Sequence, residues 1–312
     1  MNVNQTSIHD GERLQLVCPV CRKPLVSQPG AWTCAACARR FPIIAGFPDL
    51  VVGERFDDPS DAALLAYEEG SNADLTRHYW QPLFKRLWPA PTRPPRLLSV
   101  GCGTGVDVDL LRAAGYESVG IDCGNRTAVW PRRKAIDYLL LANGKHLPFP
   151  DNSFDAAFCG CVFPHVGVVG DSNIPAPDVD AQRRELAHEM ARVVRPGGYI
   201  VVSSPNRWFP FDIFHGRTPG SYTPRFNPPS ARFLLSVGDY TRLFSDAGCR
   251  RARPLPVENY WGFVRSKHTL RGWLLGLPVR FIFWLTSRKA FAWLRGSVLS
   301  PWLVVLLEKK DR

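Results

Sequence analysis

The sequence predicts an α/β fold in which a Rossmann-like sheet carries helices on both faces. A glycine-rich turn at residues 101–105 follows a short apolar segment and precedes a helix-like one. Strand-like and helix-like segments then alternate up to about residue 206, as they do in βαβ units. Two C-x2-C pairs near the N-terminus indicate a separate metal-binding module. We therefore expect a cysteine module at residues 1–54, a linker and a helix at 55–95, and the α/β domain at 96–312.

Composition constrains the partners and the compartment more than the fold. The 312 residues can bury a substantial core, and 39 Lys and Arg against 28 Asp and Glu give a net charge of +11. This charge favours an anionic partner without choosing among nucleic acid, anionic lipid and a phosphorylated substrate. The N-terminus lacks a basic region followed by an apolar run, and no segment offers about 18 uninterrupted apolar residues. The sequence therefore predicts a cytoplasmic protein and leaves peripheral membrane association open.

Cys18, Cys21, Cys34 and Cys37 have the spacing of a zinc site. Each C-x2-C pair can turn both sulfurs toward one tetrahedral ion, and four protein ligands would close the site, so the zinc is expected to be structural. A redox-active pair would need a thioredoxin-like βαβ context, which this part of the sequence lacks. The stretches LVCPVCRKPLV and WTCAACARRFPIIAGFPDLV resemble the small zinc-ribbon proteins that activate tRNA, rRNA and release-factor methyltransferases.

Between the cysteine module and the glycine turn, the sequence predicts a linker and one helix. Residues 57–63 are acidic and polar, as linkers often are. Residues 72–88 show the apolar spacing of a helix, and Pro82 is expected to kink it. The prolines between residues 89 and 95 end any helix before the sheet begins.

The glycine turn is expected to bind a ligand. Residues 96–100 form the predicted strand before it, and residues 107–114 form the helix after it. Glycines allow positive φ angles and close backbone approach, and the helix N-terminus offers unpaired N–H groups. The G-x-G-x-G spacing differs from the G-x-G-x-x-G of dinucleotide enzymes. A second strand ends at Asp122, whose carboxylate could accept hydrogen bonds from a ribose, whether or not the ligand is a dinucleotide.

Three further segments follow in a fixed order. Residues 138–142 and 156–162 are strand-like, with NGKHLPFPDNSFD between them. The stretch ELAHEMARVVRPGGYIVVSSPN is typical of a helix, a glycine turn and a fifth strand. In that helix Leu186 and Met190 share the apolar face, and Arg183 is expected to lie mostly off it.

The LPFPDNSFD and RPGG segments resemble signatures of class I S-adenosylmethionine-dependent methyltransferases, especially those that act on small molecules. The resemblance covers residues 96–206 and the terminal strand, and it implies a seven-stranded sheet, an enzyme and S-adenosylmethionine as cofactor. The family usually carries Asp where this chain has Asn143, whose amide oxygen can still accept a hydrogen bond from adenine. The resemblance implies that the amino-acid end of the cofactor lies against Gly101, Cys102, Gly103 and Gly105, and its ribose against Asp122 and Cys123. The adenine would lie against Asn143 and Gly144, and the methyl group against Cys159 and Gly160.

Two regions are candidates for binding the methyl acceptor. His165, just beyond the fourth strand, stands where related O-methyltransferases often have a histidine, and it could take the proton of a hydroxyl acceptor. It could also simply cap a backbone carbonyl. The second region follows the fifth strand, where the aromatic side chains could instead belong to the core. Its expected pocket residues are Asn206, Arg207, Trp208 and Asp212, with His215 as a second candidate catalytic group.

The C-terminal half is expected to complete the sheet. Residues 238–248 are helix-like, residues 250–257 would form the sixth strand, and residues 303–307 the last one. An insert at about residues 258–298 interleaves Trp and Phe with Lys and Arg. It suits a helical hairpin at a membrane interface, an apolar acceptor channel, or a helical lid packed on the sheet.

Three functions remain open on the sequence alone. The first is methyl transfer to a small-molecule or lipid-linked acceptor, most simply to a hydroxyl, which His165 and the insert favour. The second is methylation of an rRNA or tRNA base, because some rRNA guanine methyltransferases also join a zinc module to this fold and the net charge would favour phosphate. The third is a non-catalytic S-adenosylmethionine-binding subunit. The oligomeric state is not predicted.

Overall fold

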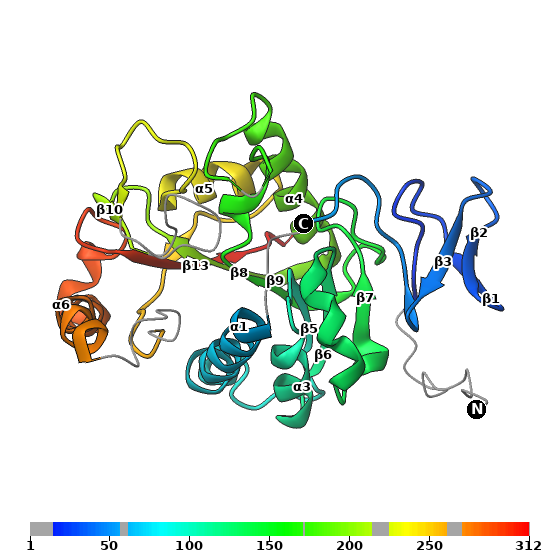
Figure 1. Cartoon of the computed structure of the whole chain (residues 1–312), viewed down its shortest axis with the longest axis horizontal. Coiled ribbons are helices and arrows are strands. Elements are labelled where there is room, and N and C mark those ends of the chain that lie inside the picture. Colours follow the sequence, from blue (N-terminus) through cyan, green and yellow to red (C-terminus); the bar gives the residue numbers. More distant parts are fainter. Residues whose placement is uncertain (1–14, 57–61, 171, 214–224, 261–269, 312) are drawn as a thin grey trace.

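The computed structural model describes residues 15–56, 62–170, 172–213, 225–260 and 270–311. Its main sheet has seven strands in the order β12-β13-β9-β8-β5-β6-β7, and β13 alone runs antiparallel to its neighbours (Figure 1). The sheet confirms the predicted fold class. Its strands are β5 (Arg96–Val100), β6 (Glu117–Asp122), β7 (Leu139–Leu141), β8 (Phe154–Gly160), β9 (Val194–Pro205), β12 (Arg253–Pro254) and β13 (Trp302–Glu308).

Helices cover both faces of the main sheet, with α4 and α5 on one face and α1 and α3 on the other (Figure 1). Because both faces are covered, the central strands β5 and β8 are apolar and buried over almost their whole length. The helices are α1 (Ala62–Leu75), α2 (Gln81–Leu87), α3 (Val106–Ala113), α4 (Val179–Val193) and α5 (Val237–Asp246), with short 3-10 turns at η2 (Asn125–Arg132), η3 (Ile136–Tyr138) and η4 (Phe163–His165).

The predicted glycine turn after α4 is wrong. The helix ends at Val193 and β9 begins at Val194, so RPGG lies inside the strand, where the pairing with β8 shifts register. A side chain at Gly198 would come within 2.7 Å of the backbone oxygen of Asp155. The glycine therefore serves the close approach of two strands and not a reversal of the chain.

Two other predicted elements have different bounds. The helix expected at residues 72–88 begins already at Ala62, and a π-helical turn, η1 (Thr76–Trp80), joins α1 to α2 in place of a proline kink. Pro82 has no N–H, so the helical turn before it receives no backbone bond from this position. The strand expected at residues 250–257 is reduced to β12, because prolines within it cannot donate to the ladder.

The cysteine module is a four-stranded antiparallel sheet packed at the β7 side of the main sheet (Figure 1). Its buried residues Leu16 and Phe41 belong to the same hydrophobic cluster as Leu147 and Phe149, which precede β8. The Val17 N–H also donates to the Pro148 oxygen over 3.0 Å. The module is therefore continuous with the main core. Its strands are β1 (Leu25–Gln28), β2 (Ala31–Cys34), β3 (Arg40–Ile44) and β4 (Phe47–Pro48).

The insert before the last strand contains one long helix in its described part, α6 (Leu270–Ser287), followed by the 3-10 turn η6 (Lys289–Leu294). The helical hairpin considered for this segment is not seen in residues 270–298, and residues 261–269 lie outside the described ranges. Within the parts of the chain that the structure describes, no helix is both long and apolar enough to cross a bilayer.

Asp155, at the start of β8, is a buried carboxylate that ties three segments together. It accepts two hydrogen bonds from Arg93, over 2.8 and 2.9 Å, one from the Arg96 N–H over 2.7 Å, and one from Arg195 over 2.6 Å. Burial alone would raise its pKa, but the hydrogen bonds from Arg195, Arg96 and Arg93 outweigh burial and lower the pKa below the ordinary value.

This carboxylate makes the fold sensitive to acid. Because the folded pKa of Asp155 is lowered, its stabilisation is present above the unfolded pKa of about 3.9 and is lost as the pH falls through the folded value. We expect Asp155→Asn to lower the free energy of unfolding by about 3 kcal/mol at neutral pH, and by much less near pH 2. Urea denaturation at the two pH values measures this. Asp151→Asn, at an exposed ion pair, should cost less than about 1 kcal/mol, and an equal loss for both variants would contradict the assignment.

Candidate functional site

The glycine turn between β5 and α3 is built for close backbone approach. Gly101, Gly103 and Gly105 have φ angles of 70°, 55° and 73°, in the left-handed region that side chains disfavour. A side chain at Gly101 would also come within 2.5 Å of Val162, and one at Gly105 within 3.0 Å of Leu139. The backbone conformation therefore favours glycine at all three positions, and close contacts add a second reason at Gly101 and Gly105.

Asp122, at the end of β6, holds this turn in place. One carboxylate oxygen accepts from the Gly103 N–H and the other from the Gly124 N–H, each over 2.8 Å. Burial raises the pKa of Asp122, while these two N–H groups and the nearby Arg126 oppose the shift. The indole of Trp130 donates to the Gly103 oxygen over 2.8 Å. Asp122 is the residue predicted to bind the ribose, and it lies beside the glycine turn.

Two buried polar atoms at this turn lack a hydrogen-bond partner among the described residues. They are the Thr104 hydroxyl oxygen and one carboxylate oxygen of Asp107, whose other oxygen accepts from Ser99 over 2.5 Å. Burial raises the pKa of Asp107 to about 6. Unpaired buried polar atoms are rare, so the hydrogen bonding of the protein itself is incomplete at this turn. Neither residue was predicted to belong to the site, although Thr104 stands within the G-x-G-x-G motif and Asp107 in the first turn of the helix after it.

Asn143, which is predicted to bind adenine, contacts the segment at residues 49–56, which we call the connecting segment. Nothing in the sequence indicates this contact. The side-chain N–H of Asn143 donates to the Glu54 oxygen over 3.4 Å, and its amide oxygen accepts from the Lys145 N–H over 3.0 Å. Lys145 also pairs with the Glu54 carboxylate over 3.2 Å. Asn143 is thus buried between β7 and the end of the cysteine module.

The connecting segment also contacts the residues that come directly after β6. The Phe56 N–H donates to the Cys123 oxygen over 3.3 Å, and the Asn125 N–H donates to the Phe56 oxygen over 3.1 Å. A side chain at Gly124 would come within 2.8 Å of the Phe56 oxygen. The segment therefore runs across the ends of two strands that carry predicted cofactor residues. Gly144 is close-packed as well, because a side chain there would come within 2.8 Å of Leu186.

The four cysteines of the N-terminal module converge as predicted. Their sulfur atoms all lie within 4.8 Å of one another, with 3.7 Å between Cys18 and Cys37 and 3.4 Å between Cys21 and Cys34. Four thiolates around a tetrahedral zinc ion at about 2.3 Å would lie about 3.8 Å apart, so the donor set fits zinc.

The backbone around each cysteine pair repeats the same turn. The N–H of Cys18 donates to the Lys23 oxygen over 2.8 Å, and the N–H of Cys34 donates to the Arg39 oxygen over 2.9 Å. The residue after each pair, Arg22 or Ala38, has a positive φ angle, 61° or 57°. Two matching turns facing each other give four converging sulfurs, which supports a closed structural site.

The candidate acceptor region begins where β8 ends. Cys159 is buried, Gly160 is exposed, and Cys161 has a φ angle of 58°, a strained conformation for a residue other than glycine. His165 lies in the next turn, η4, half-buried, with its ring 5.8 Å from the Phe233 ring and perpendicular to it. His165 therefore stands beyond the carboxyl end of β8, on the side of the sheet where ligands bind in such folds.

Arg183, in α4, holds the η4 turn against the segment before α5. Although only 3% exposed, its guanidinium donates to the backbone oxygens of Phe163, Pro164 and Val166 on one side and of Arg232 and Phe233 on the other, over 2.7 to 3.2 Å. The expectation that Arg183 lies off the buried side of the helix is wrong. The guanidinium is buried because five carbonyl oxygens pair with it.

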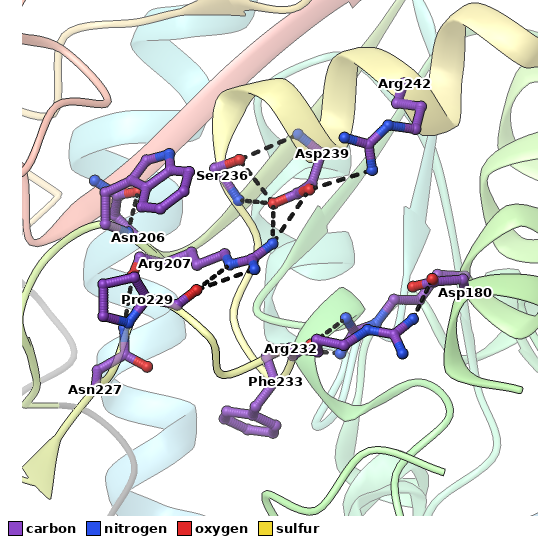
Figure 2. Close-up of polar contacts among 12 residues, drawn as sticks. Asp180, Asn206, Arg207, Asn227, Pro229, Arg232, Phe233, Ser236, Asp239 and Arg242 are labelled. Carbon is purple, nitrogen blue, oxygen red and sulfur yellow. Dashed lines mark hydrogen bonds and ion pairs between the residues drawn. The ribbon is translucent and has the colours of Figure 1, made fainter. Parts of the chain in front are cut away.

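The residues predicted after the fifth strand are engaged by the protein itself. Arg207 lies between the Asp239 carboxylate, 3.3 Å away, and the Pro229 oxygen, and it contacts the exposed Trp208 ring (Figure 2). Asn206 is buried and donates to the oxygens of Ser297 and Ser300, just before β13. Asn206 and Arg207 thus link the end of β9 to α5 and to the insert.

Asp212 is fully buried in the short strand β10 (Phe211–Asp212), which pairs with β11 (Arg225–Phe226). Arg225 donates to it over 3.0 Å, and the Arg225 guanidinium lies 5.1 Å from the centre of the Phe233 ring. Because Phe233 also contacts His165, this ion pair is connected to the acceptor region. The second predicted histidine, His215, lies outside the described residues.

Comparisons with known proteins agree with this geometry. A family described as "Methyltransferase domain" matches residues 98–202. A "Probable S-adenosylmethionine-dependent methyltransferase" of Mycobacterium tuberculosis is 30% identical over 200 residues, which cover 61% of this chain and 62% of that protein. A demethylmenaquinone methyltransferase of Beutenbergia cavernae is 30% identical over 189 residues, which cover 57% of this chain and 71% of that protein. The chain thus spans less than two thirds of the length of the mycobacterial relative.

Solved structures with a similar arrangement are more distant. A chain of the complex that contains the Haloferax volcanii Trm112 methyltransferase activator has 15% identity and a TM-score of 0.45, over 81% of this chain and 99% of that one. A SAM-dependent methyltransferase from Aquifex aeolicus has 17% identity and a TM-score of 0.42, over 63% of this chain and 93% of that one.

Proposed function

Because this chain belongs to the S-adenosylmethionine-dependent methyltransferases, we propose that it transfers a methyl group to a hydroxyl of a small-molecule or lipid-linked acceptor. The observation that carries the cofactor part of the proposal is the glycine turn between β5 and α3, which is held by Asp122 and has unpaired buried polar atoms at Thr104 and, in α3, at Asp107. The likeness to demethylmenaquinone methyltransferases, which are named for a small-molecule substrate, supports the class of acceptor.

The cofactor would lie along the carboxyl ends of β5, β6 and β7. We assign its amino-acid end to the glycine turn with Cys102 and Thr104, its ribose to Asp122 and Cys123, and its adenine to Asn143 and Gly144. Asn143 is held by Glu54 and Lys145, so the connecting segment would fix the orientation of the amide. Cys159 and Gly160 would form the floor beneath the methyl group.

Bound S-adenosylmethionine would supply a methyl carbon on a positively charged sulfur. A nucleophile can attack this carbon directly, with the sulfur as leaving group. The protein has to align the acceptor oxygen with that carbon and exclude water. In the proposed reaction His165 would accept the proton of the acceptor hydroxyl, so that the acceptor oxygen could take the methyl group that bound S-adenosylmethionine would supply, with the sulfur as leaving group. Arg183 acts only as a positioning residue, because it holds the backbone of the η4 turn.

The cysteine module would hold one zinc ion through Cys18, Cys21, Cys34 and Cys37. Four protein ligands leave no position for substrate, so the ion would stabilise the module and take no part in methyl transfer. The module would serve the reaction indirectly through the connecting segment, which reaches the predicted ribose and adenine residues.

The acceptor class can be tested by labelling. The purified protein is incubated with radiolabelled S-adenosylmethionine and either total RNA or an extract of lipids and small molecules. We expect label in the extract, and we expect Asp122→Ala to weaken S-adenosylmethionine binding about tenfold or more, because the glycine turn loses the bond from Gly103 to the carboxylate and the proposed ribose contact is lost as well. Asp137→Ala changes an exposed carboxylate on η3 and should behave as the parent protein does.

A further variant separates binding from transfer. His165→Gln should retain S-adenosylmethionine binding in calorimetry and lose most of the labelling, since the proposed base is removed while the cofactor residues remain. Labelled RNA that disappears with Asp122→Ala would overturn the small-acceptor proposal. Cofactor binding without labelling of either fraction would favour a non-catalytic binding subunit.

A further inference from the structure

The helix α6 exposes a continuous apolar face to solvent. Leu274, Leu277, Phe281 and Trp284 are spaced by three, four and three residues, so they lie on one face of the helix. Each is between 42% and 59% exposed, and the Phe281 and Trp284 rings stack with their centres 5.9 Å apart. The opposite face packs inward, where Phe283 is 3% exposed. Large apolar side chains clustered on one exposed face are unusual unless something covers them.

Further large apolar side chains are exposed in the turn that follows the helix. Trp293 is 75% exposed, and Phe291, Val298 and Leu299 are exposed as well. Arg295 ties this turn to the end of α6 by donating to the Thr286 oxygen over 2.7 Å. We call the exposed apolar side chains of α6, η6 and residues 298–299 the insert face. In Figure 1, α6 lies at one end of the long axis of the molecule, and the cysteine module lies at the other.

The sequence that carries the insert face contains cations and no acidic residue. From residue 259 to residue 307 the sequence contains no Asp or Glu, and it contains the seven cations Arg265, Lys267, Arg271, Arg280, Arg288, Lys289 and Arg295. Lys289 is exposed, and Arg288 lies 5.0 Å from the centre of the Trp284 ring. Arg288 also pairs with Glu258, at the border of this region, over 2.8 Å. At the end of α6, Arg288 therefore lies beside the exposed apolar side chain of Trp284.

We propose that the insert face docks on an anionic lipid surface. Trp, Phe and Leu on one side of a helix enter the boundary between headgroups and acyl chains, and neighbouring Lys and Arg bind the anionic headgroups. Each cation near such a surface adds to the attraction, and added salt screens it. This inference goes beyond the proposed function and needs neither cofactor nor acceptor. It would place the protein where a lipid-linked or apolar acceptor is concentrated.

Vesicle sedimentation tests the proposal with the full-length protein and no cofactor. We expect the protein to sediment with phosphatidylcholine vesicles that contain about 30 mol% phosphatidylglycerol, less with phosphatidylcholine alone, and less at about 1 M salt. The variant Phe281→Ser/Trp284→Ser/Trp293→Ser should bind about tenfold or more weakly, because the apolar insertion is lost. The variant Arg288→Gln/Lys289→Gln should lose part of the preference for phosphatidylglycerol.

The control changes apolar side chains of similar exposure elsewhere. Val26→Ser/Ile44→Ser alters the cysteine module, where Val26 is 54% and Ile44 48% exposed, and it should bind vesicles as the parent protein does. No binding to either kind of vesicle would overturn the proposal. An equal loss of binding in the triple variant of the insert face and in the Val26→Ser/Ile44→Ser control would overturn it as well. A dimer in sedimentation equilibrium that the triple variant converts to monomer would also overturn it, since a second copy would then cover the face. Because the readout is sedimentation, its failure is distinct from failure of the labelling experiment.

Discussion

Cys18→Ser is expected to release the metal and to weaken S-adenosylmethionine binding at a site formed by other segments. The free energy of zinc binding to four thiolates, about 10 to 16 kcal/mol in small zinc modules, is folding free energy of the module. With three thiolates the two matching turns no longer close, and the strands β1 to β4 have little apolar core of their own. We expect metal content to fall to near zero and the dissociation constant for S-adenosylmethionine to rise about tenfold, or about 1.4 kcal/mol.

The expected loss of cofactor affinity follows from the connecting segment. Leu50 donates to the Leu141 oxygen over 2.8 Å, and Phe56 and Glu54 contact the backbone after β6 and the Asn143 side chain. A disordered module would leave this segment free. Metal analysis and calorimetry measure the two effects, and Cys249→Ala, a buried cysteine outside the module, is the control. Normal cofactor affinity in a metal-free Cys18→Ser protein would show that the module and the site are independent.

Arg183→Met should be among the most destabilising single substitutions in the main domain. The change leaves the carbonyl oxygens of five residues in two segments without their donor in a buried place. Burial lowers the pKa of Arg183 to about 10, so the group is still charged at neutral pH and its loss removes charge-assisted bonds. We expect the free energy of unfolding to fall by about 3 to 5 kcal/mol in urea denaturation.

The neighbouring arginine provides the matched control for this prediction. Arg184 is about half exposed and lies 3.8 Å from Asp246, so Arg184→Met should cost less than about 1 kcal/mol. Arg183→Lys keeps the charge but cannot reach all five oxygens, and it should fall between the two. Equal stability of Arg183→Met and Arg184→Met would contradict the role given to the buried guanidinium.

Features encoded by nearby residues were predictable from the sequence. The order of strand, glycine turn and helix at residues 96–114 and the four cysteines each depend on short spacings, and the structure has them as predicted. The start of β9 was missed, because RPGG is typical of a turn. Here the glycines instead let β9 approach Asp155 in β8, a contact between residues about 40 positions apart that no local pattern reveals.

The candidate site was less predictable where it depends on long-range contacts. Nothing in the composition of residues 49–56 indicates their contacts. Glu54 accepts a hydrogen bond from the Asn143 side chain, and Phe56 bonds to the backbone just after β6. Arg183 looked like a surface residue, since its carbonyl partners come from two distant segments. Thr104 and Asp107 stand in the recognised motif, but their unpaired atoms emerge only from the packing around them.

The borders of the main sheet have a consequence for self-association. At one border β7 is only three residues long, and Asp49 of the connecting segment pairs alongside it at Leu141. At the other border β12 has two residues, and Pro254 presents no N–H group. Long unpaired edges are templates on which further copies add strands and aggregate. Both borders are blunted here, so growth of the sheet from one molecule into the next is disfavoured, and copies of this protein would have to associate through side chains.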